Sequence, residues 1–202
     1  MNDVDAPQFW EDIYLDDDAG WDLNGITPVF QHLSTKLKTG SVCFVGCGRG
    51  YDAVHFAKLG FQVTAVDFAP TAINFVKTLA KDAKVKVDAL RTDIFSLTRD
   101  HMNTYDYIIE QTCFCAIHPS RRQEYERLVK TILKPNGKLI GLWFPLDKTL
   151  EEGGPPWGTT IEEVKSIFAN RWTIEKEEFP DLSIESRKGR EKLIIFRKEN
   201  QS

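Results

Sequence analysis

Short apolar segments alternate with longer amphipathic segments along most of this 202-residue sequence. The runs at 41–45, 62–66, 87–91 and 105–109 have the length and composition of strands, as expected where a strand is buried on both faces. The segments 52–59, 71–81 and 121–133 carry apolar residues at helical spacing. This alternation predicts an α/β fold with a doubly wound, mostly parallel sheet and helices on both faces.

The pattern changes in the last third of the sequence. Pro135-Asn136-Gly137 has turn chemistry, which predicts the end of the helix over 121–133 and a new strand over 138–144. A helix over 160–169 and strands over 172–179 and 191–197 follow. The connection between these two strands is too short for a helix, so we expect an antiparallel hairpin at one edge of the sheet. Because no repeat or linker interrupts the sequence, residues 1–202 are predicted to form a single domain.

Charge and composition exclude several classes of function. The 26 Lys and Arg residues against 30 Asp and Glu residues give a net charge of -4, which argues against a nucleic-acid partner. The acidic start Met1-Asn2-Asp3-Val4-Asp5 is unlike a signal peptide, and there is no apolar stretch of the ~20 residues that span a bilayer. We therefore expect a cytoplasmic, monomeric protein that acts on a small molecule, away from membranes.

The four cysteines favour reduced thiols over disulfides. Cys43, Cys47, Cys113 and Cys115 all lie in or beside apolar runs. Their Cys-x3-Cys and Cys-x-Cys spacings differ from the Cys-x2-Cys pattern that is usual in zinc sites. We predict no metal site.

A glycine-rich turn, Gly46-Cys47-Gly48-Arg49-Gly50, joins the first predicted strand to the first predicted helix. In a doubly wound sheet such a turn lies at the carboxyl ends of the strands, where ligands bind. Asp67 ends the second strand, where a carboxylate can accept hydrogen bonds from both ribose hydroxyls of an adenosine. The turn and Asp67 together predict an adenosine-bearing ligand; the plain alternative is that the glycines only make a tight turn.

The spacing of the glycines distinguishes between adenosine ligands. The dinucleotide-binding pattern has its third glycine where this sequence has Tyr51, which disfavours a pyrophosphate. Gly46-x-Gly48-x-Gly50 resembles instead the turn of class I S-adenosylmethionine-dependent methyltransferases, whose cofactor has no phosphate. Asp93-Ile94 follows the third strand and is a candidate for the adenine, while Glu110-Gln111 ends the fourth and is a candidate for the methionyl end. The alternatives are a loop carboxylate and a solvated strand end.

Further motifs are spread over nearly the whole sequence. They are Trp10, Trp21-Asp22, Gly25, Thr27-Pro28, Gly50-Tyr51-Asp52, Phe114-Cys115-Ala116-Ile117 with Pro119, Leu133-Lys134-Pro135-x-Gly137, Gly153-Gly154-Pro155-Pro156, and Arg187-Lys188-Gly189 before Glu191-Lys192-Leu193. Together they resemble the thiopurine methyltransferase superfamily and, within it, the halide/thiol methyltransferases of plants and bacteria. The resemblance implies a Rossmann-like class I methyltransferase fold, S-adenosyl-L-methionine as cofactor and S-adenosyl-L-homocysteine as product.

The resemblance also implies that residues 1–35 form a lid over the cofactor. The family's lid usually carries three tryptophans; Trp10 and Trp21 match the first and third, and Tyr14 replaces the middle one. Ring faces attract cations, which suits a sulfonium. The cofactor-binding candidates are Trp10, Tyr14, Trp21, Gly46, Cys47, Gly48, Asp67, Asp93, Ile94, Glu110 and Gln111.

Methyl transfer from a sulfonium is an in-line displacement, so the protein must align the donor and acceptor and exclude water. Phe144 and Trp157 are candidates for the wall of the acceptor pocket, and Arg187 is a candidate for favouring an anionic acceptor. The alternative without a role in binding is a core ring for Phe144, a loop anchor for Trp157 and a solvated turn arginine for Arg187. His118, which precedes Pro119 at an expected helix start, is interpreted as an exposed polar residue and not as a base.

These observations predict a methyltransferase acting on a small soft nucleophile: a thiol, a thiopurine-like thiol, hydrosulfide, thiocyanate or a halide. Halide-methylating relatives tend to have Tyr at the positions of Phe144 and Trp157, and Asp-Tyr at Glu110-Gln111, so the identity of the acceptor stays open. Two alternatives remain. One is an O- or N-methyltransferase of a small metabolite, and the other is a non-catalytic protein that binds the cofactor or its product.

Overall fold

The computed structural model describes residues 3–200, and its contacts divide the chain into two compact units, Met1–Ile94 and Phe95–Ser202. Residues 1 and 2 of the predicted lid, and residues 201 and 202 of the predicted domain, lie outside the described residues. The prediction of a single domain came from the continuity of the sequence and stays a prediction.

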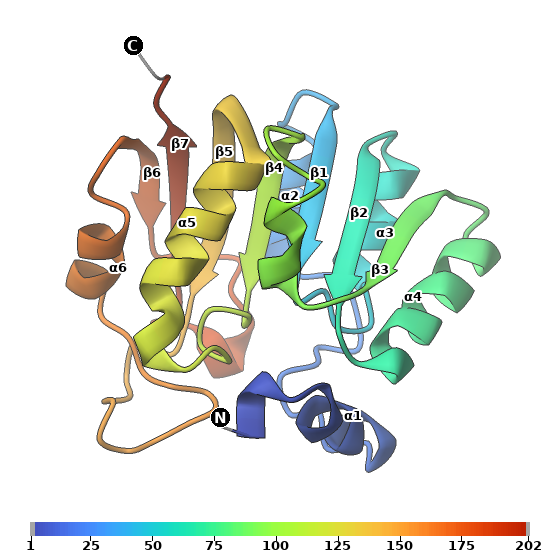
Figure 1. The fold of residues 1–202 in the computed structure, drawn as a ribbon, viewed down its shortest axis with the longest axis horizontal. Coiled ribbons are helices and arrows are strands. Elements are labelled where there is room, and N and C mark those ends of the chain that lie inside the picture. Colours follow the sequence, from blue (N-terminus) through green and yellow to red (C-terminus); the bar gives the residue numbers. More distant parts are fainter. Residues whose placement is uncertain (1–2, 201–202) are drawn as a thin grey trace. The chain divides into compact units, whose positions relative to one another are not determined.

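The first unit is built on three parallel strands, β1 (Ser41–Val45), β2 (Gln62–Asp67) and β3 (Val87–Arg91). Val42 is aligned with Val63 and Val63 with Val87, so β2 pairs with both of its neighbours. Helices α3 (Tyr51–Lys58) and α4 (Pro70–Asp82) flank these strands (Figure 1). All five elements confirm the sequence prediction to within one residue at each end.

Two helices of the first unit had no counterpart in the sequence prediction. They are α1 (Pro7–Leu15), which follows the short 3-10 turn η1 (Asp3–Asp5), and α2 (Pro28–Ser34). Each begins with a proline, whose fixed φ and missing N–H suit the first helical turn. In α1 the buried side chains are Trp10 and Tyr14, four positions apart and therefore on one face.

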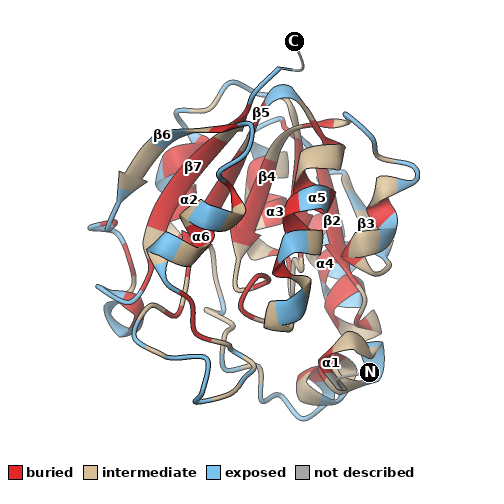
Figure 2. Ribbon diagram, turned by 60° about the vertical axis from the view of Figure 1, so that its left-hand side comes forward, coloured by how far each residue is buried: buried red, intermediate tan, exposed pale blue. Residues whose placement is uncertain are grey.

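In the second unit, residues 95–200 form four strands and two α-helices. Its α/β part consists of β4 (Tyr105–Gln111), α5 (Arg122–Ile132) and β5 (Leu133–Trp143), with β4 and β5 parallel. After α6 (Ile161–Ile167), β6 (Trp172–Glu178) pairs antiparallel with β7 (Lys192–Lys198), and β7 pairs antiparallel with β5. The hairpin prediction is confirmed. Figure 2 shows β7 mostly buried and β6 mostly not, as expected of an edge strand rich in charged residues.

The strands follow one another as β3-β2-β1 in the first unit and as β4-β5-β7-β6 in the second. This order, parallel except for the β6–β7 edge, confirms the predicted doubly wound α/β class.

One local prediction in the second unit was wrong. Pro135-Asn136-Gly137 was expected to form a turn before a strand, yet it lies inside β5, which begins at Leu133 directly after α5. The pairing steps from Tyr105–Leu133 to Tyr107–Lys138, so the extra residues form an irregularity in the strand, and Asn136 has a φ of 63°. Residues 135–137 do interrupt regular structure, as their composition indicates, but the interruption lies within β5 and not before it.

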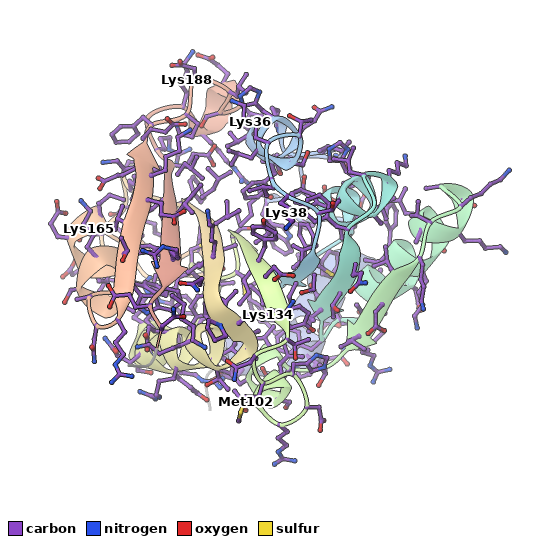
Figure 3. All side chains as sticks on the ribbon, turned by 90° about the horizontal axis from the view of Figure 1, so that it is seen from above. Lys36, Lys38, Met102, Lys134, Lys165 and Lys188 are labelled. Atoms are coloured by element: carbon purple, nitrogen blue, oxygen red, sulfur yellow. The ribbon has the colours of Figure 1, made fainter. Side chains whose placement is uncertain are left out.

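Three 3-10 turns complete the chain: η2 (Ile94–Thr98), η3 (Pro119–Arg121) and η4 (Glu185–Arg187). The last of these lies in the connection between β6 and β7. Within residues 3–200, no helix has the length and apolarity needed to cross a membrane. Lys36, Lys188 and Met102 are exposed and extend outward (Figure 3). A cytoplasmic location and a monomeric state stay predictions.

Candidate functional site

The glycine turn depends on glycine for its conformation and for its packing. Gly46, Gly48 and Gly50 have φ values of 58°, 54° and 73°, in the left-handed region that other residues rarely adopt. A Cβ atom on Gly50 would lie 2.5 Å from Cγ2 of Val76 in α4. The Cys47 N–H donates to the carbonyl of Val66, which attaches the turn to the end of β2. The turn therefore presents bare backbone at the carboxyl ends of the strands.

Asp67 closes the other side of this turn. Its Oδ2 accepts a 3.0 Å hydrogen bond from the Gly48 N–H, and its Oδ1 accepts a 3.0 Å bond from the Ala69 N–H. The side chain is only 7% exposed, and burial raises the pKa of Asp67 to about 6 despite these bonds. A carboxylate offers about four lone-pair sites, so it can accept further bonds from hydroxyl groups.

The three aromatic residues of the predicted lid form one cluster. The Trp21 ring lies edge-on to Trp10 at 5.5 Å and to Tyr14 at 5.7 Å, measured between ring centroids. Trp10 and Tyr14 are buried, and a Cβ on Gly48 would lie 3.2 Å from the Tyr14 hydroxyl, so the cluster adjoins the glycine turn. Burial and the charge of Asp67 both raise the pKa of Tyr14, which keeps this hydroxyl protonated.

Two carboxylate side chains for which no role was predicted attach the N-terminal segment to helices α3 and α4. Glu11 accepts bonds from the N–H and hydroxyl of Thr71 at the start of α4, at 2.9 and 2.6 Å. Asp52 of α3 accepts bonds from the N–H and hydroxyl of Thr27, at 2.9 and 2.7 Å. Asp52 belongs to the motif Gly50-Tyr51-Asp52, so the sequence itself marks it as a candidate for a structural or functional role. Nothing in the sequence pairs Glu11 with a residue 60 positions away.

Asp93 and Ile94 follow a residue that is hydrogen-bonded to the backbone of Asp67. The Thr92 N–H donates to the carbonyl of Asp67 at 3.1 Å, so the segment after β3 begins beside the end of β2. Ile94 is buried, and Asp93 is half-buried. Their contacts with an adenine stay predictions.

In the second unit, the Glu110 side chain is held by the turn that follows β4. Oε1 accepts bonds from the N–H groups of Cys113 and Phe114, at 3.0 and 2.9 Å, and Oε2 accepts a 2.5 Å bond from the Tyr125 hydroxyl. Burial raises the pKa of Glu110 to about 7, although these bonds oppose the rise. The carboxylate therefore shapes residues 112–115, and a direct contact of Glu110 or Gln111 with a methionyl group stays a prediction.

The three acceptor-side candidates gather in one region of the second unit. The guanidinium carbon of Arg187 lies 5.1 Å from the centroid of the Phe144 ring, and that of Arg190 lies 5.3 Å from it. The Trp157 N–H donates to the carbonyl of Cys115 at 2.8 Å. Burial raises the pKa of the Cys115 thiol to about 12, and the nearby positive charge of Arg187 opposes this rise.

Arg187 is buried, and is therefore not the solvated turn residue that the sequence allowed as an alternative. It is 5% exposed, and the Arg187 and Glu191 side chains are 3.9 Å apart. Burial lowers the pKa of the Arg187 guanidinium, which nonetheless stays charged because an arginine begins so high. Glu191 compensates part of this charge, and water screens the field of the pair little because both side chains are buried.

The cysteines and the carboxylates show no arrangement that suits a metal. All four cysteines are thiols, not disulfides. Over the described part of the chain, no group of three or more His, Cys, Asp or Glu side chains is placed to hold an ion.

The fold and the glycine turn define a ligand-binding α/β protein of the class I methyltransferase kind. The family model for thiopurine S-methyltransferases matches residues 5–201. A probable thiol methyltransferase 2 of Arabidopsis thaliana is 31% identical over 197 residues, covering 94% of this chain and 84% of the relative. Thiocyanate methyltransferase 1 of Brassica oleracea is also 31% identical over 197 residues, covering 95% and 85%. The chain belongs to the thiopurine S-methyltransferase family.

Solved structures agree on the fold. The 1,6-didemethyltoxoflavin-N1-methyltransferase of Burkholderia thailandensis, crystallised with its substrate and S-adenosylhomocysteine, has a TM-score of 0.75 at 20% identity, covering 96% of this chain and 87% of that one. An S-adenosylmethionine-dependent methyltransferase of Methanosarcina mazei has a TM-score of 0.72 at 18% identity, covering 88% and 100%. The family and the fold confirm the predicted S-adenosylmethionine-dependent methyltransferase.

Proposed function

We propose that this protein transfers a methyl group to a small soft nucleophile: a thiol, a thiopurine-like thiol, hydrosulfide, thiocyanate or a halide ion. The observation that carries the proposal is the buried Arg187 guanidinium beside the Phe144 ring, with Trp157 in the same region of the second unit. A desolvated cation next to an aromatic ring favours an acceptor that is anionic and polarisable. Relatives named for thiols, thiocyanate and thiopurines support this choice.

The residues of the first unit fit the cofactor of the family. S-Adenosylmethionine supplies a methyl group on a positively charged sulfur. In this proposal the bare backbone of Gly46, Cys47 and Gly48 allows the cofactor a close approach, and Asp67 accepts bonds from its ribose hydroxyls. The aromatic cluster of Trp10, Tyr14 and Trp21 excludes water and offers ring faces to a cation. The remaining candidates are Asp93 and Ile94 for the adenine, and Glu110 and Gln111 for the methionyl end.

A soft anion needs no general base, and the surroundings of the nearest candidates agree with this. His118 Nδ1 accepts a 3.3 Å bond from the Ser120 N–H, so this nitrogen is engaged in capping η3. Glu110 is enclosed by three donors. Oxygen and most nitrogen acceptors must lose a proton during transfer, so the O- or N-methyltransferase alternative requires a base that these residues are poorly arranged to supply.

The test is a panel of acceptors with methyl-labelled S-adenosylmethionine. The panel contains a thiol, a thiopurine, hydrosulfide, thiocyanate and iodide, with a phenol and an amine as oxygen and nitrogen acceptors. We expect label transfer to at least one soft nucleophile, and a large loss of that activity in Arg187→Met. Arg197→Met is the matched control, because Arg197 is a partly exposed, ion-paired arginine of the edge hairpin.

Each other outcome contradicts the proposal in a distinct way. Transfer to the phenol or amine alone would identify the alternative enzyme. Calorimetry that detects S-adenosylhomocysteine binding, without transfer to any acceptor, would identify a non-catalytic binding protein. Absence of cofactor binding would exclude both kinds of enzyme.

A further inference from the structure

Arg49, the residue between the second and third glycines of the turn, binds the segment that follows α1. One terminal nitrogen of its guanidinium lies 2.6 Å from Oδ1 of Asp17, and the other lies 3.1 Å from Oδ2 of Asp22. The second nitrogen also lies 3.4 Å from the side-chain oxygen of Asn24. The segment 16–24 contains Trp21, so the turn that is proposed to meet the cofactor also holds the chain that carries one of the three lid aromatics.

The surroundings of Arg49 make this attachment stronger than an ordinary surface ion pair. Its side chain is 17% exposed and that of Asp22 is 10% exposed, so solvent screens this pair little. The contact of Arg49 with Asp17 is a charge-assisted hydrogen bond, whereas its contact with Asp22 is an ion pair without hydrogen-bond geometry. The guanidinium also lies 5.5 Å from the centroid of the Phe75 ring, which adds a contact from α4.

The backbone of the segment depends on these contacts. Asp17 and Asn24 have φ values of 54° and 51°, in the left-handed region that aspartate and asparagine adopt more readily than other non-glycine residues. The Asn24 N–H donates to Oδ1 of Asp22, which leaves Oδ2 of the same carboxylate for Arg49. Arg49 thus contacts the side chains of both left-handed residues, at the two ends of the segment.

Arg49 differs in kind from the other two attachments of the N-terminal segment. Glu11 connects this segment to the start of α4, and Asp52 connects it to the start of α3, just after the glycine turn. Arg49 belongs to the glycine turn. Any displacement of the turn by a ligand is therefore transmitted directly to residues 16–24, and any opening of that segment pulls on the turn.

We propose that Arg49 is a positioning residue that couples occupation of the glycine turn to closure of the aromatic cluster. It acts through Asp22 and Asp17, and it keeps Trp21 packed against Trp10 and Tyr14. The inference rests on the proposed function, because it assumes that the turn binds S-adenosylmethionine. Its consequence is kinetic: loss of Arg49 lets the segment open, so the cofactor and its product dissociate faster while the transfer step itself is little affected.

The experiment measures dissociation of S-adenosylhomocysteine by stopped-flow tryptophan fluorescence in full-length variants. Arg49→Met keeps the aliphatic stem and removes the charge and the fork, and we expect dissociation about tenfold faster, equivalent to about 1.4 kcal/mol. Arg49→Lys keeps the charge alone and should rescue part of the loss. Arg197→Met is the matched control and should leave the dissociation rate unchanged.

Steady-state kinetics separate a positioning role from a general loss of stability. We expect the KM for S-adenosylmethionine in Arg49→Met to rise about tenfold while kcat stays within about twofold. Asp22→Asn should reproduce the effect and Asp17→Asn should show less of it, since the Asp17 side chain is 83% exposed. These two variants also keep the test valid if Arg49→Met fails to fold.

A folded Arg49→Met or Asp22→Asn protein with wild-type dissociation rates would overturn the inference. Equal effects in Arg197→Met would do the same, because they would show a nonspecific response to loss of an ion pair. Failure of the proposed function would look different, since the wild-type protein itself would then bind no S-adenosylhomocysteine or transfer no methyl group to a soft nucleophile.

Discussion

The hydroxyl of Tyr125 on α5 donates a 2.5 Å hydrogen bond to the carboxylate of Glu110 at the end of β4. The other oxygen of this carboxylate accepts the N–H groups of Cys113 and Phe114. Cys115, the next residue, accepts the Trp157 N–H through its carbonyl. Glu110 therefore supports the backbone to which one of the acceptor-side candidates is attached, and its influence on catalysis can be indirect and still large.

Replacing Glu110 tests whether its charge or its hydrogen bonds matter. In Glu110→Gln the amide oxygen can accept both backbone N–H bonds and the amide nitrogen can meet Tyr125, so we expect kcat within about threefold of wild type. Glu110→Ala leaves three buried donors without an acceptor and should lower the free energy of unfolding by about 3 kcal/mol or more. Activity assays and urea denaturation measure the two effects. A Glu110→Gln protein that is stable but inactive would instead favour a base-dependent reaction.

The buried carboxyl groups predict that stability falls as pH rises. Burial raises the pKa of Glu110 from 4.5 to about 7, and those of Asp52 and Asp67 from 3.8 to about 6. The folded protein therefore binds more protons than the unfolded chain between about pH 4 and pH 7, so the free energy of unfolding decreases through this window. For Glu110 the decrease is about 3 kcal/mol, at 1.36 kcal/mol for each pKa unit.

Urea denaturation across that pH range provides the measurement. The slope should be smaller in Glu110→Gln, which has no proton to lose at this position. A free energy of unfolding that is flat or rises between pH 5 and pH 7 would contradict the prediction, because it would mean that these carboxyl groups titrate alike in the folded and unfolded states.

Elements with a strong local signal were predictable from the sequence. The strands at 41–45 and 87–91 agree with the structure at both ends, because the flanking turns and the apolar runs point to the same boundaries. Helices α1 and α2 were not predicted. Their apolar faces are short, and burial of Trp10 and Tyr14 in α1, and of Phe30 and Leu33 in α2, stabilises them more than their own sequence does.

The sequence indicates where the candidate residues lie, at strand ends and in turns, but not what their side chains contact. The sequence places Glu110 at a strand end, yet only the fold directs its carboxylate toward Tyr125. Likewise, Arg187 in a polar turn reads as exposed, but η4 folds its side chain inward against Phe144. The roles of Arg49 and Glu11 depend on partners distant in sequence, which no local pattern identifies.

Gly50 and Gly189 form a matched pair for measuring the packing of the glycine turn. Their φ values are 73° and 74°, so alanine carries the same backbone cost of about 1 kcal/mol at either position. A Cβ meets Val76 at 2.5 Å in Gly50→Ala and nothing within 4 Å in Gly189→Ala. We expect Gly50→Ala to be the less stable variant by a further 1–3 kcal/mol, roughly the range for overpacking. Equal losses of stability in the two variants, measured by thermal or urea unfolding, would show that α4 moves aside for the added methyl group at no cost in free energy.

Asp67 provides a direct test of the ribose contact. Asp67→Asn keeps one acceptor oxygen and loses the charge, so we expect S-adenosylhomocysteine to bind about tenfold more weakly by calorimetry. Asp67→Ala confounds the test, because it also leaves the Gly48 and Ala69 N–H groups unpaired. Since the pKa of Asp67 is about 6, the wild-type affinity should also decline as pH falls below this value. Unchanged affinity in Asp67→Asn would remove Asp67 from the binding site.

Substitutions of His118 test whether this residue has a structural or a catalytic role. Its Nδ1 accepts the Ser120 N–H and lies 2.8 Å from the Ser120 hydroxyl, which caps η3, and its ring lies 5.3 Å from the Trp157 ring. His118→Asn can retain the cap through its side-chain oxygen, whereas His118→Ala loses it at about 1 kcal/mol of stability. We expect both variants to keep the wild-type dependence of kcat on pH with a thiol or thiocyanate acceptor. A loss of more than about a hundredfold in both, with the acidic limb of the profile abolished, would mean that His118 accepts a proton and that the acceptor is not a soft anion.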